Sequence, residues 1–321
     1  TRYISVTGVQ TCALPILYKI TSRWPHQDTI KVEWNLGKRC NLDCSYCPSE
    51  IHDNFSNHTN IDILKSVIDV LCSINEPIRL GLTGGEPSVH PNIEQLLNYS
   101  KNSGISWISM TTNATRTSDW YYKQSQYLNQ YVFSLHFEKD YQRLLNNILD
   151  FHLRDHKIKI LVHIMAHHKH IPEVKSVVDT FNLFKIPYVI RRIRWTAGDH
   201  DLFDDLRYND EDLLWIKRHT ATVEPNCLVD NKDLFHANDI IKLNQNNFKN
   251  WSCNAGVESL MINWDGEVYR ATCRVGGSLG NIYQGSFILP NSPITCTRNW
   301  CTCEADIPLT KTSEKTQETP D

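Results

Sequence analysis

Between residues 30 and 195, short apolar runs rich in β-branched side chains alternate with longer amphipathic stretches. The runs predict strands, which we place at residues 30–36, 78–82, 105–111, 131–137, 157–165 and 188–193. The stretches between them repeat apolar side chains at helical spacing, as Leu64, Val67, Ile68 and Leu71 do. Alternating β and α units predict a parallel sheet, and right-handed crossovers allow that sheet to curl into a barrel. We therefore expect an α/β fold with a partial (β/α)6 TIM-like barrel.

The pattern changes after the sixth predicted strand. Residues 197–250 begin with an acidic run, expected to be a solvated loop, and continue with two predicted helices at 210–219 and 237–248. Residues 259–263 and 267–270 alternate around Asp265-Gly266, a dipeptide typical of two-residue β-hairpin turns. We expect this hairpin to belong to a small C-terminal module of hairpin and loops.

These patterns divide the chain into five segments. The opening residues resemble a translated sequencing adapter, and the closing residues are polar without large apolar side chains. The expected segments are a non-native or disordered N-terminus at 1–16, the barrel at 17–196, a helical linker at 197–250, the C-terminal module at 251–309 and a disordered tail at 310–321.

Polar residues and glycines gather where the predicted strands end. In a parallel barrel the carboxyl ends of the strands meet at one face, and active sites lie there. The six ends carry, in chain order, a loop with three cysteines, Gly84-Gly85-Glu86, Thr112-Asn113, Ser134 with His136, residues 163–168, and Arg191-Arg192 with Arg194. We therefore predict one functional site at this face.

The loop after the first strand carries Cys40, Cys44 and Cys47 in a C-x3-C-x2-C spacing. Three thiolates on one short loop suit a metal centre that keeps one position open. A structural zinc site is usually closed by four ligands, whereas a 4Fe–4S cube held by three cysteines leaves one iron free. A zinc loop is the plainer alternative.

This loop, with Tyr46 before its last cysteine, resembles the signature of the radical S-adenosylmethionine (radical SAM) superfamily. Gly84-Gly85-Glu86-Pro87 resembles the second motif of the same superfamily. The resemblance implies a catalytic 4Fe–4S cluster on the three cysteines, with the amine and carboxylate of SAM on the open iron. It further implies reductive cleavage of SAM to a 5′-deoxyadenosyl radical, which abstracts hydrogen from a substrate.

The same resemblance implies roles for single residues. Gly84, Gly85 and Glu86 would contact the SAM amino group, and the Tyr46 backbone would contact the adenine. Asn113 and Ser134 would contact the ribose and methionine parts, and an inward-facing Arg191 or Arg192 would suit the SAM carboxylate. Read alone, each has an ordinary explanation, such as a tight glycine turn, a cap residue or a surface arginine.

Five further cysteines fall between residues 253 and 303, namely Cys253, Cys273, Cys296, Cys301 and Cys303. Two flank the predicted hairpin and three lie near the end of the module. They resemble the Twitch or SPASM extension of radical SAM enzymes and imply one auxiliary 4Fe–4S cluster. Five is one cysteine more than one cluster needs, so the set of four stays open. A zinc ribbon is the structural alternative.

Four histidines at 163, 167, 168 and 170 raise a second metal hypothesis. No carboxylate or cysteine joins them at a recognisable spacing, so we favour a polar strand-to-helix loop. His163 and His136 remain candidates for lining a substrate cavity.

The composition narrows the classes of function. The chain has 321 residues, 11 cysteines and a formal net charge of −3, which gives no reason to expect nucleic-acid binding. No apolar run reaches the ~20 residues that span a bilayer, and clustered cysteines without a secretory signal favour a reducing cytoplasm.

We therefore expect a cytoplasmic radical SAM oxidoreductase-type enzyme acting on a small molecule or peptide, with a flavodoxin- or ferredoxin-type electron donor. A SPASM-type maturase of ribosomal peptides or proteins is the main alternative, although residues 17–29 are too short for a peptide-clasping domain. A tRNA or base modifier is disfavoured by charge. A non-enzymatic zinc-binding interaction module is the rival of another class.

Overall fold

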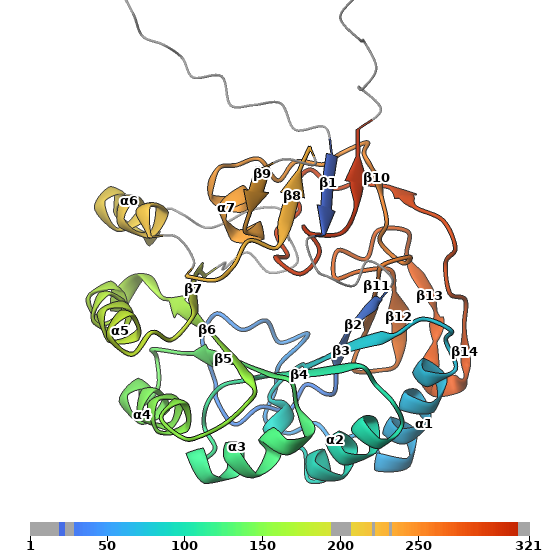
Figure 1. Ribbon diagram of the computed structural model, residues 1–321, viewed down its shortest axis with the longest axis horizontal. Helices are drawn as coiled ribbons and strands as arrows, with labels where there is room; N and C mark the ends of the chain where they lie inside the picture. Colours follow the sequence, from blue (N-terminus) through green and yellow to red (C-terminus); the bar gives the residue numbers. More distant parts are fainter. Residues whose placement is uncertain (1–18, 23–28, 194–206, 220–221, 231–232, 314–321) are drawn as a thin grey trace, which may run out of the picture.

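The structure is a computed structural model that describes residues 19–22, 29–193, 207–219, 222–230 and 233–313. Expectations for residues 1–16, for the acidic run at 199–205 and for Arg194 lie outside these residues. The described chain forms two sheets with helices around them (Figure 1).

Six parallel strands form the centre of a ten-stranded sheet and pair in chain order. They are β2 (Ile30–Asn35), β3 (Ile78–Thr83), β4 (Trp107–Thr112), β5 (Gln130–Leu135), β6 (Lys159–Ala166) and β7 (Tyr188–Arg192). Each corresponds to a predicted strand, with bounds shifted by one or two residues at most ends. In β4 the reason is local, because Ile105 N–H donates to the Ser100 carbonyl and closes the preceding helix.

Helices cover the outer face of this curved sheet (Figure 1). They are α1 (Ile61–Cys72), α2 (Ile93–Asn102), α3 (Ser118–Gln124), α4 (Tyr141–His152) and α5 (Ile171–Phe184), with 3₁₀ helices at Pro87–Val89, Ser125–Tyr127 and His168–His170. Alternate residues of β2 and β3 are buried under these helices, and the residues between them are half-buried on the inner face. This alternation confirms the α/β expectation of a parallel sheet with helices outside. Among the described residues the sheet does not close, and β7 and β14 (Ser286–Phe287) are its edges.

The predicted hairpin forms, but it belongs to the barrel sheet. Strands β11 (Ser259–Ile262) and β12 (Glu267–Tyr269) pair antiparallel, as the Asp-Gly turn predicted. However, β11 also pairs in parallel with β2, so the hairpin extends the barrel instead of standing in a separate module. Strand β13 (Ser278–Asn281), a 3₁₀ helix at Ile282–Gln284 and β14 continue the same sheet.

A second, six-stranded sheet corrects three expected boundaries. Its order is β15 (Ile294–Thr295), β10 (Ser252–Cys253), β16 (Lys311–Thr312), β1 (Lys19–Ser22), β8 (Cys227–Val229) and β9 (Asp233–Phe235). Residues 19–22 were predicted in the barrel, residues 227–229 and 233–235 in a helical linker, and residues 311–312 in a disordered tail. Antiparallel pairing with distant partners places all three here, which no local pattern reveals.

Two further helices lie in the segment between β7 and β10. The predicted helix at 210–219 is α6 (Asp210–Arg218), and the one at 237–248 is the shorter α7 (Ala237–Lys242). In Figure 1 the second sheet and α7 lie across the open side of the curved barrel sheet. Within the described residues, no helix is long and apolar enough to cross a membrane.

Candidate active site

A cavity of about 500 Å³ lies at the carboxyl ends of the parallel strands. All of the barrel residues predicted to bind a cluster or SAM line it, namely Cys40, Cys44, Tyr46, Cys47, Gly84, Gly85, Glu86, Asn113, Ser134, Arg191 and Arg192. His136 and His163 line it as well. Its opposite wall, which the sequence did not predict, comes from Ile216 on α6, Asn238 and Lys242 on α7, and Thr302.

The cysteine loop is closed at its base by main-chain hydrogen bonds. Cys40 N–H donates to the Asp53 carbonyl at 2.7 Å, and Asp53 N–H donates to the Lys38 carbonyl at 2.9 Å. The Lys38 ammonium lies 3.6 Å from the Asp53 carboxylate. This closure holds the intervening residues as a compact loop over the end of β2.

Of the three thiols of the loop, Cys44 is buried, and Cys40 and Cys47 are half-buried. Burial raises the pKa of Cys44 to about 11 and that of Cys47 to about 12, and it also raises the pKa of Cys40. Ligation to a metal would therefore release protons. In the described part of the chain, no three or more His, Cys, Asp or Glu side chains converge on a position for a single metal ion. The fit to a cluster rests on the donor set, because three soft thiolates facing one cavity suit iron–sulfur ligation.

Gly84 and Gly85 are constrained by the cysteine loop itself. Gly84 has a φ of 126°, and Gly85 N–H donates to the Gly37 carbonyl at 2.7 Å. A Cβ on Gly85 would lie 2.3 Å from the carbonyl oxygens of Lys38 and Arg39. The tight turn therefore packs closely against the loop backbone, and its predicted approach to a ligand stays a prediction. The two motifs are thus packed against each other.

Glu86 joins the ends of β3 and β4. Its carboxylate accepts from Thr112 Oγ1 at 2.7 Å, Asn113 N at 2.6 Å and Ser88 N at 3.0 Å. Burial raises the pKa of Glu86, while these donors oppose the shift. The Asn113 side chain donates to Asn41 Oδ1 at 2.9 Å, so it supports the cysteine loop directly.

We expect Glu86→Ala to destabilise the fold by at least about 2 kcal/mol, because three buried donors lose their acceptor and each such loss costs about 1–3 kcal/mol. Urea unfolding followed by circular dichroism measures this. Glu86→Gln, which retains one carbonyl acceptor, should lose less. Equal unfolding free energies for Glu86→Ala and wild type would contradict the assigned contacts.

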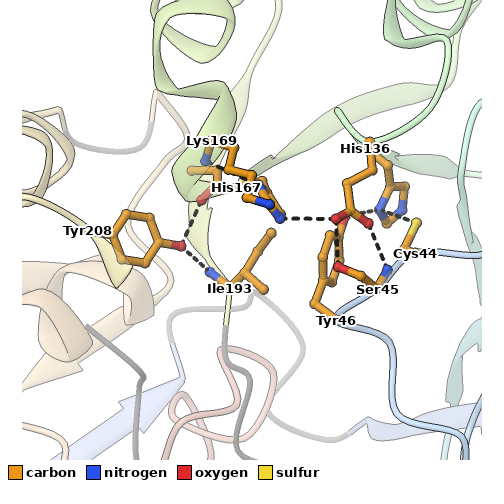
Figure 2. A network of polar contacts seen from close by, with 10 residues as sticks. Cys44, Ser45, Tyr46, His136, His167, Lys169, Ile193 and Tyr208 are labelled. Atoms are coloured by element: carbon orange, nitrogen blue, oxygen red, sulfur yellow. Dashed lines mark hydrogen bonds and ion pairs between the residues drawn. The ribbon is translucent and has the colours of Figure 1, made fainter. Parts of the chain in front are cut away.

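Tyr46 lies against His136 on the cavity wall (Figure 2). Its hydroxyl is 2.6 Å from His136 Nδ1, and Cys44 Sγ is 3.7 Å from the same nitrogen. Burial lowers the pKa of His136 to about 4 and raises that of Tyr46. Near neutral pH the tyrosine is therefore protonated and the imidazole uncharged, and the hydrogen bond between them orients both rings beside the cysteine loop.

Glu138 is a site residue that the sequence analysis missed. Its carboxylate accepts from Ser45 N at 2.7 Å and Ser45 Oγ at 2.6 Å, and it pairs with His167 Nε2 at 3.1 Å. It therefore ties the cysteine loop to the turns after β5 and β6. The available signal was its position, two residues beyond His136 in the alternation that begins in β5.

The four histidines do not act together. His163 lies on β6 and faces the cavity, whereas His167 and the 3₁₀ helix after it follow the end of that strand. His167 bonds to Glu138, which accounts for its position without a metal.

A buried ion network ties the cavity to the C-terminal segment. Arg191 pairs with Glu304 at 2.6 Å, and His236 pairs with the same carboxylate at 3.2 Å. Arg191 also lies 3.3 Å from His163 Nε2, and burial lowers the pKa of His163 to about 3. Burial raises the pKa of Glu304, but Arg191 and His236 outweigh burial and hold it well below its usual range. Arg191 thus already has a carboxylate partner, Glu304, which directly follows Cys303 in the chain.

We expect Glu304→Gln to destabilise the fold by about 1–3 kcal/mol at neutral pH, because the half-buried Arg191 charge loses its carboxylate partner. The folded pKa of Glu304 is depressed, so its contribution is present above the unfolded value of about 4.3 and is lost as the pH falls. Urea unfolding of both proteins over a pH series checks this. A difference that stays constant, or grows, towards acidic pH would contradict it.

The fold brings the five C-terminal cysteines into one neighbourhood. Cys253, Cys296 and Cys301 are buried, and Cys273 and Cys303 are half-buried. Burial raises the pKa of Cys273 to about 12, and the nearby Cys253 and Cys296 thiols add to that shift. Burial likewise raises the pKa of Cys301, with Cys303 and Cys273 as neighbours. Cys303 Sγ also contacts Thr272 Oγ1 at 3.5 Å.

Comparisons with known proteins find similarity over part of the chain. Residues 34–164 match the family model of the Radical SAM superfamily. The Fe-coproporphyrin III synthase of Methanosarcina barkeri is 34% identical over 85 residues, which are 26% of this chain and 21% of that protein. The GTP 3′,8-cyclase of Clostridium perfringens is 33% identical over 88 residues, 26% of this chain and 27% of that protein. The matched segments thus span about a quarter of these relatives.

Two solved structures share the fold. Native anSMEcpe with bound AdoMet has a TM-score of 0.53 at 15% identity, covering 79% of this chain and 78% of that one. Streptococcus suis SuiB bound to S-adenosylmethionine has a TM-score of 0.53 at 16% identity, covering 80% of this chain and 64% of that one. Both likenesses concern the fold alone.

Proposed function

We propose that this chain, whose residues 34–164 form a Radical SAM domain, is an enzyme that cleaves SAM reductively and abstracts hydrogen from a small molecule or peptide. One observation carries the proposal. The three thiols of the cysteine loop share a single cavity with the glycine motif, Asn113 and Ser134. These groups come from separate strand ends, so their convergence is a property of the fold.

Cys40, Cys44 and Cys47 would hold a 4Fe–4S cluster with one open iron. A cluster and SAM bound there would supply one-electron cleavage of SAM and a 5′-deoxyadenosyl radical. The chain itself supplies position and shielding. Main-chain bonds fix the loop, the Gly85 backbone packs beneath it, and Tyr46 and His136 form a wall beside Cys44.

SAM would lie along the strand ends. We propose that Gly84, Gly85 and Glu86 face its amino group, that the Tyr46 backbone meets the adenine, and that Asn113 and Ser134 contact its ribose and methionine parts. We assign the SAM carboxylate to an inward-facing Arg191 or Arg192, since both line the same cavity and Arg191 also pairs with Glu304.

The substrate would enter against the wall formed by α6 and α7. Ile216 supplies apolar surface and Lys242 polar surface there, and the cavity of about 500 Å³ has to hold SAM as well as the substrate. We favour a small substrate or a single peptide side chain, and a SPASM-type peptide maturase remains the alternative. A flavodoxin- or ferredoxin-type protein is the proposed electron donor.

We further propose one auxiliary 4Fe–4S cluster on four of Cys253, Cys273, Cys296, Cys301 and Cys303. The support is their shared neighbourhood in the fold. The oxidoreductase class and a cytoplasmic location belong to the same proposal, and both agree with clustered cysteines that need a reducing environment.

Anaerobic purification followed by iron and sulfide assays tests the proposal. Two four-iron clusters require about eight irons per chain. After reduction with dithionite, SAM should yield 5′-deoxyadenosine, detected by chromatography. About four irons per chain would mean that only one of the two proposed cluster sites exists. A colourless zinc protein that forms no 5′-deoxyadenosine after iron–sulfur reconstitution would overturn the enzyme assignment.

A further inference from the structure

Lys311 is a buried lysine among the C-terminal thiols. Lys311 is only 2% exposed, although the sequence analysis predicted a disordered tail at this position. Strand β16 pairs antiparallel with β10, and this register sets Lys311 opposite Cys253. The lysine is therefore part of the thiol neighbourhood.

The hydrogen bonds of Lys311 hold it in the charged form. Its Nζ donates to the carbonyl oxygens of Asp306 at 2.5 Å, Ile307 at 3.1 Å and Leu309 at 3.1 Å. An ammonium group has three protons and no acceptor, so three carbonyls match it fully, whereas a neutral amine would set a lone pair against a carbonyl. The Phe248 ring, 5.4 Å from Nζ, offers a further favourable contact for a cation.

The acidic groups around this cation are mainly thiols. Burial lowers the pKa of Lys311, but Cys253, Cys301, Asp306 and Cys227 outweigh burial and raise it. Burial raises the pKa of the Asp306 carboxyl, and the Lys31 and Lys311 charges oppose that shift. Three carbonyls, the neighbouring thiols and the Asp306 carboxyl therefore surround Lys311.

We propose that Lys311 is a fixed positive charge that stabilises an anionic iron–sulfur cluster on the C-terminal cysteines and raises its reduction potential. This inference rests on the auxiliary cluster of the proposed function. Thiolates bound to a cluster carry negative charge, and one-electron reduction, with dithionite as the donor, makes the site more negative. A buried cation is weakly screened, so it favours the reduced state. Lys311 acts through the cluster, and it is a positioning residue.

The test isolates the C-terminal site. The Cys40→Ala/Cys44→Ala/Cys47→Ala background removes the loop thiols, so about four irons per chain should remain. In that background we compare Lys311→Met, which keeps length without charge, and Lys311→Arg, which keeps charge. Lys175→Met is the control, because Lys175 on α5 pairs with Asp212 on α6, outside the strands that carry Lys311 and Cys253. Redox titration monitored by electron paramagnetic resonance gives the midpoint potential.

Lys311→Met should lower the reduced-to-oxidised ratio at a given potential at least tenfold, equal to about 59 mV for a one-electron couple. Lys175→Met should leave it unchanged. Lys311→Met could also lose its iron while its circular dichroism stays unchanged. In that case, iron retained by Lys311→Arg supports the inference, because the arginine keeps the positive charge. Loss of iron in both variants would mean that Lys311 matters only for packing, and it would overturn the inference. An unchanged midpoint potential in Lys311→Met would overturn it as well. If the parent variant, with alanine at Cys40, Cys44 and Cys47, contained no iron, the proposed auxiliary cluster itself would be wrong.

Discussion

Replacing Cys40, Cys44 and Cys47 together by alanine should abolish 5′-deoxyadenosine formation and lower the iron content by about four per chain. All three thiols face the cavity, and the fold offers the loop no substitute thiol among the residues that line it. The C-terminal cysteines lie in the other cysteine group, so the remaining iron should stay bound. Iron assay and chromatography measure the two losses.

Cys72→Ala is the matched control for this variant. Cys72 is an exposed cysteine at the end of α1, outside both cysteine groups. The Cys72→Ala variant should retain the wild-type iron content and the wild-type rate of 5′-deoxyadenosine formation. Persistent product in the triple variant would place the SAM chemistry elsewhere in the chain.

Gly85→Ala should displace the cysteine loop, with the second largest effect. Its Cβ would lie 2.3 Å from two backbone oxygens of the loop, so the backbone has to shift. We expect a loss of about 2–3 kcal/mol in unfolding free energy, as overpacking in a tight site costs. The iron of the loop cluster should be lost with it. Urea unfolding and iron assay check both effects.

Gly37→Ala is a control within the same loop. A Cβ at Gly37 has no neighbouring atom within 4 Å, and the Gly37 carbonyl can still accept from Gly85 N–H. This variant should fold and bind iron as the wild type does. If Gly85→Ala and Gly37→Ala behaved alike, the packing of the glycine motif against the loop would not matter to the site.

The barrel and its cavity could be predicted because both follow from local patterns. Alternating βα units identify a parallel sheet, and parallel strands bring their carboxyl ends to one face. Cys40, Gly85 and Ser134 therefore meet although they are far apart in the chain. For Gly85 the structure adds a constraint that the sequence did not predict, since a Cβ there would meet the Lys38 and Arg39 carbonyls.

The rest depended on pairing between distant segments. Nothing near residue 259 indicates that β11 pairs with β2, and nothing near residue 311 indicates that β16 pairs with β10. Lys311 looked like a tail residue because its three carbonyl acceptors lie in a turn that only the folded chain forms. Glu138 escaped notice because a lone glutamate after a strand is usually solvated, whereas here Ser45 comes to it from another loop.

The central claim is that SAM binds the cluster held by the cysteine loop. Electron–nuclear double resonance on the reduced protein, with SAM isotopically labelled at its amino nitrogen, tests it most directly. The account predicts a hyperfine coupling between the labelled nitrogen and the cluster, absent in the variant with alanine at Cys40, Cys44 and Cys47. No coupling in the fully loaded wild type, or an equal coupling in that variant, would contradict it.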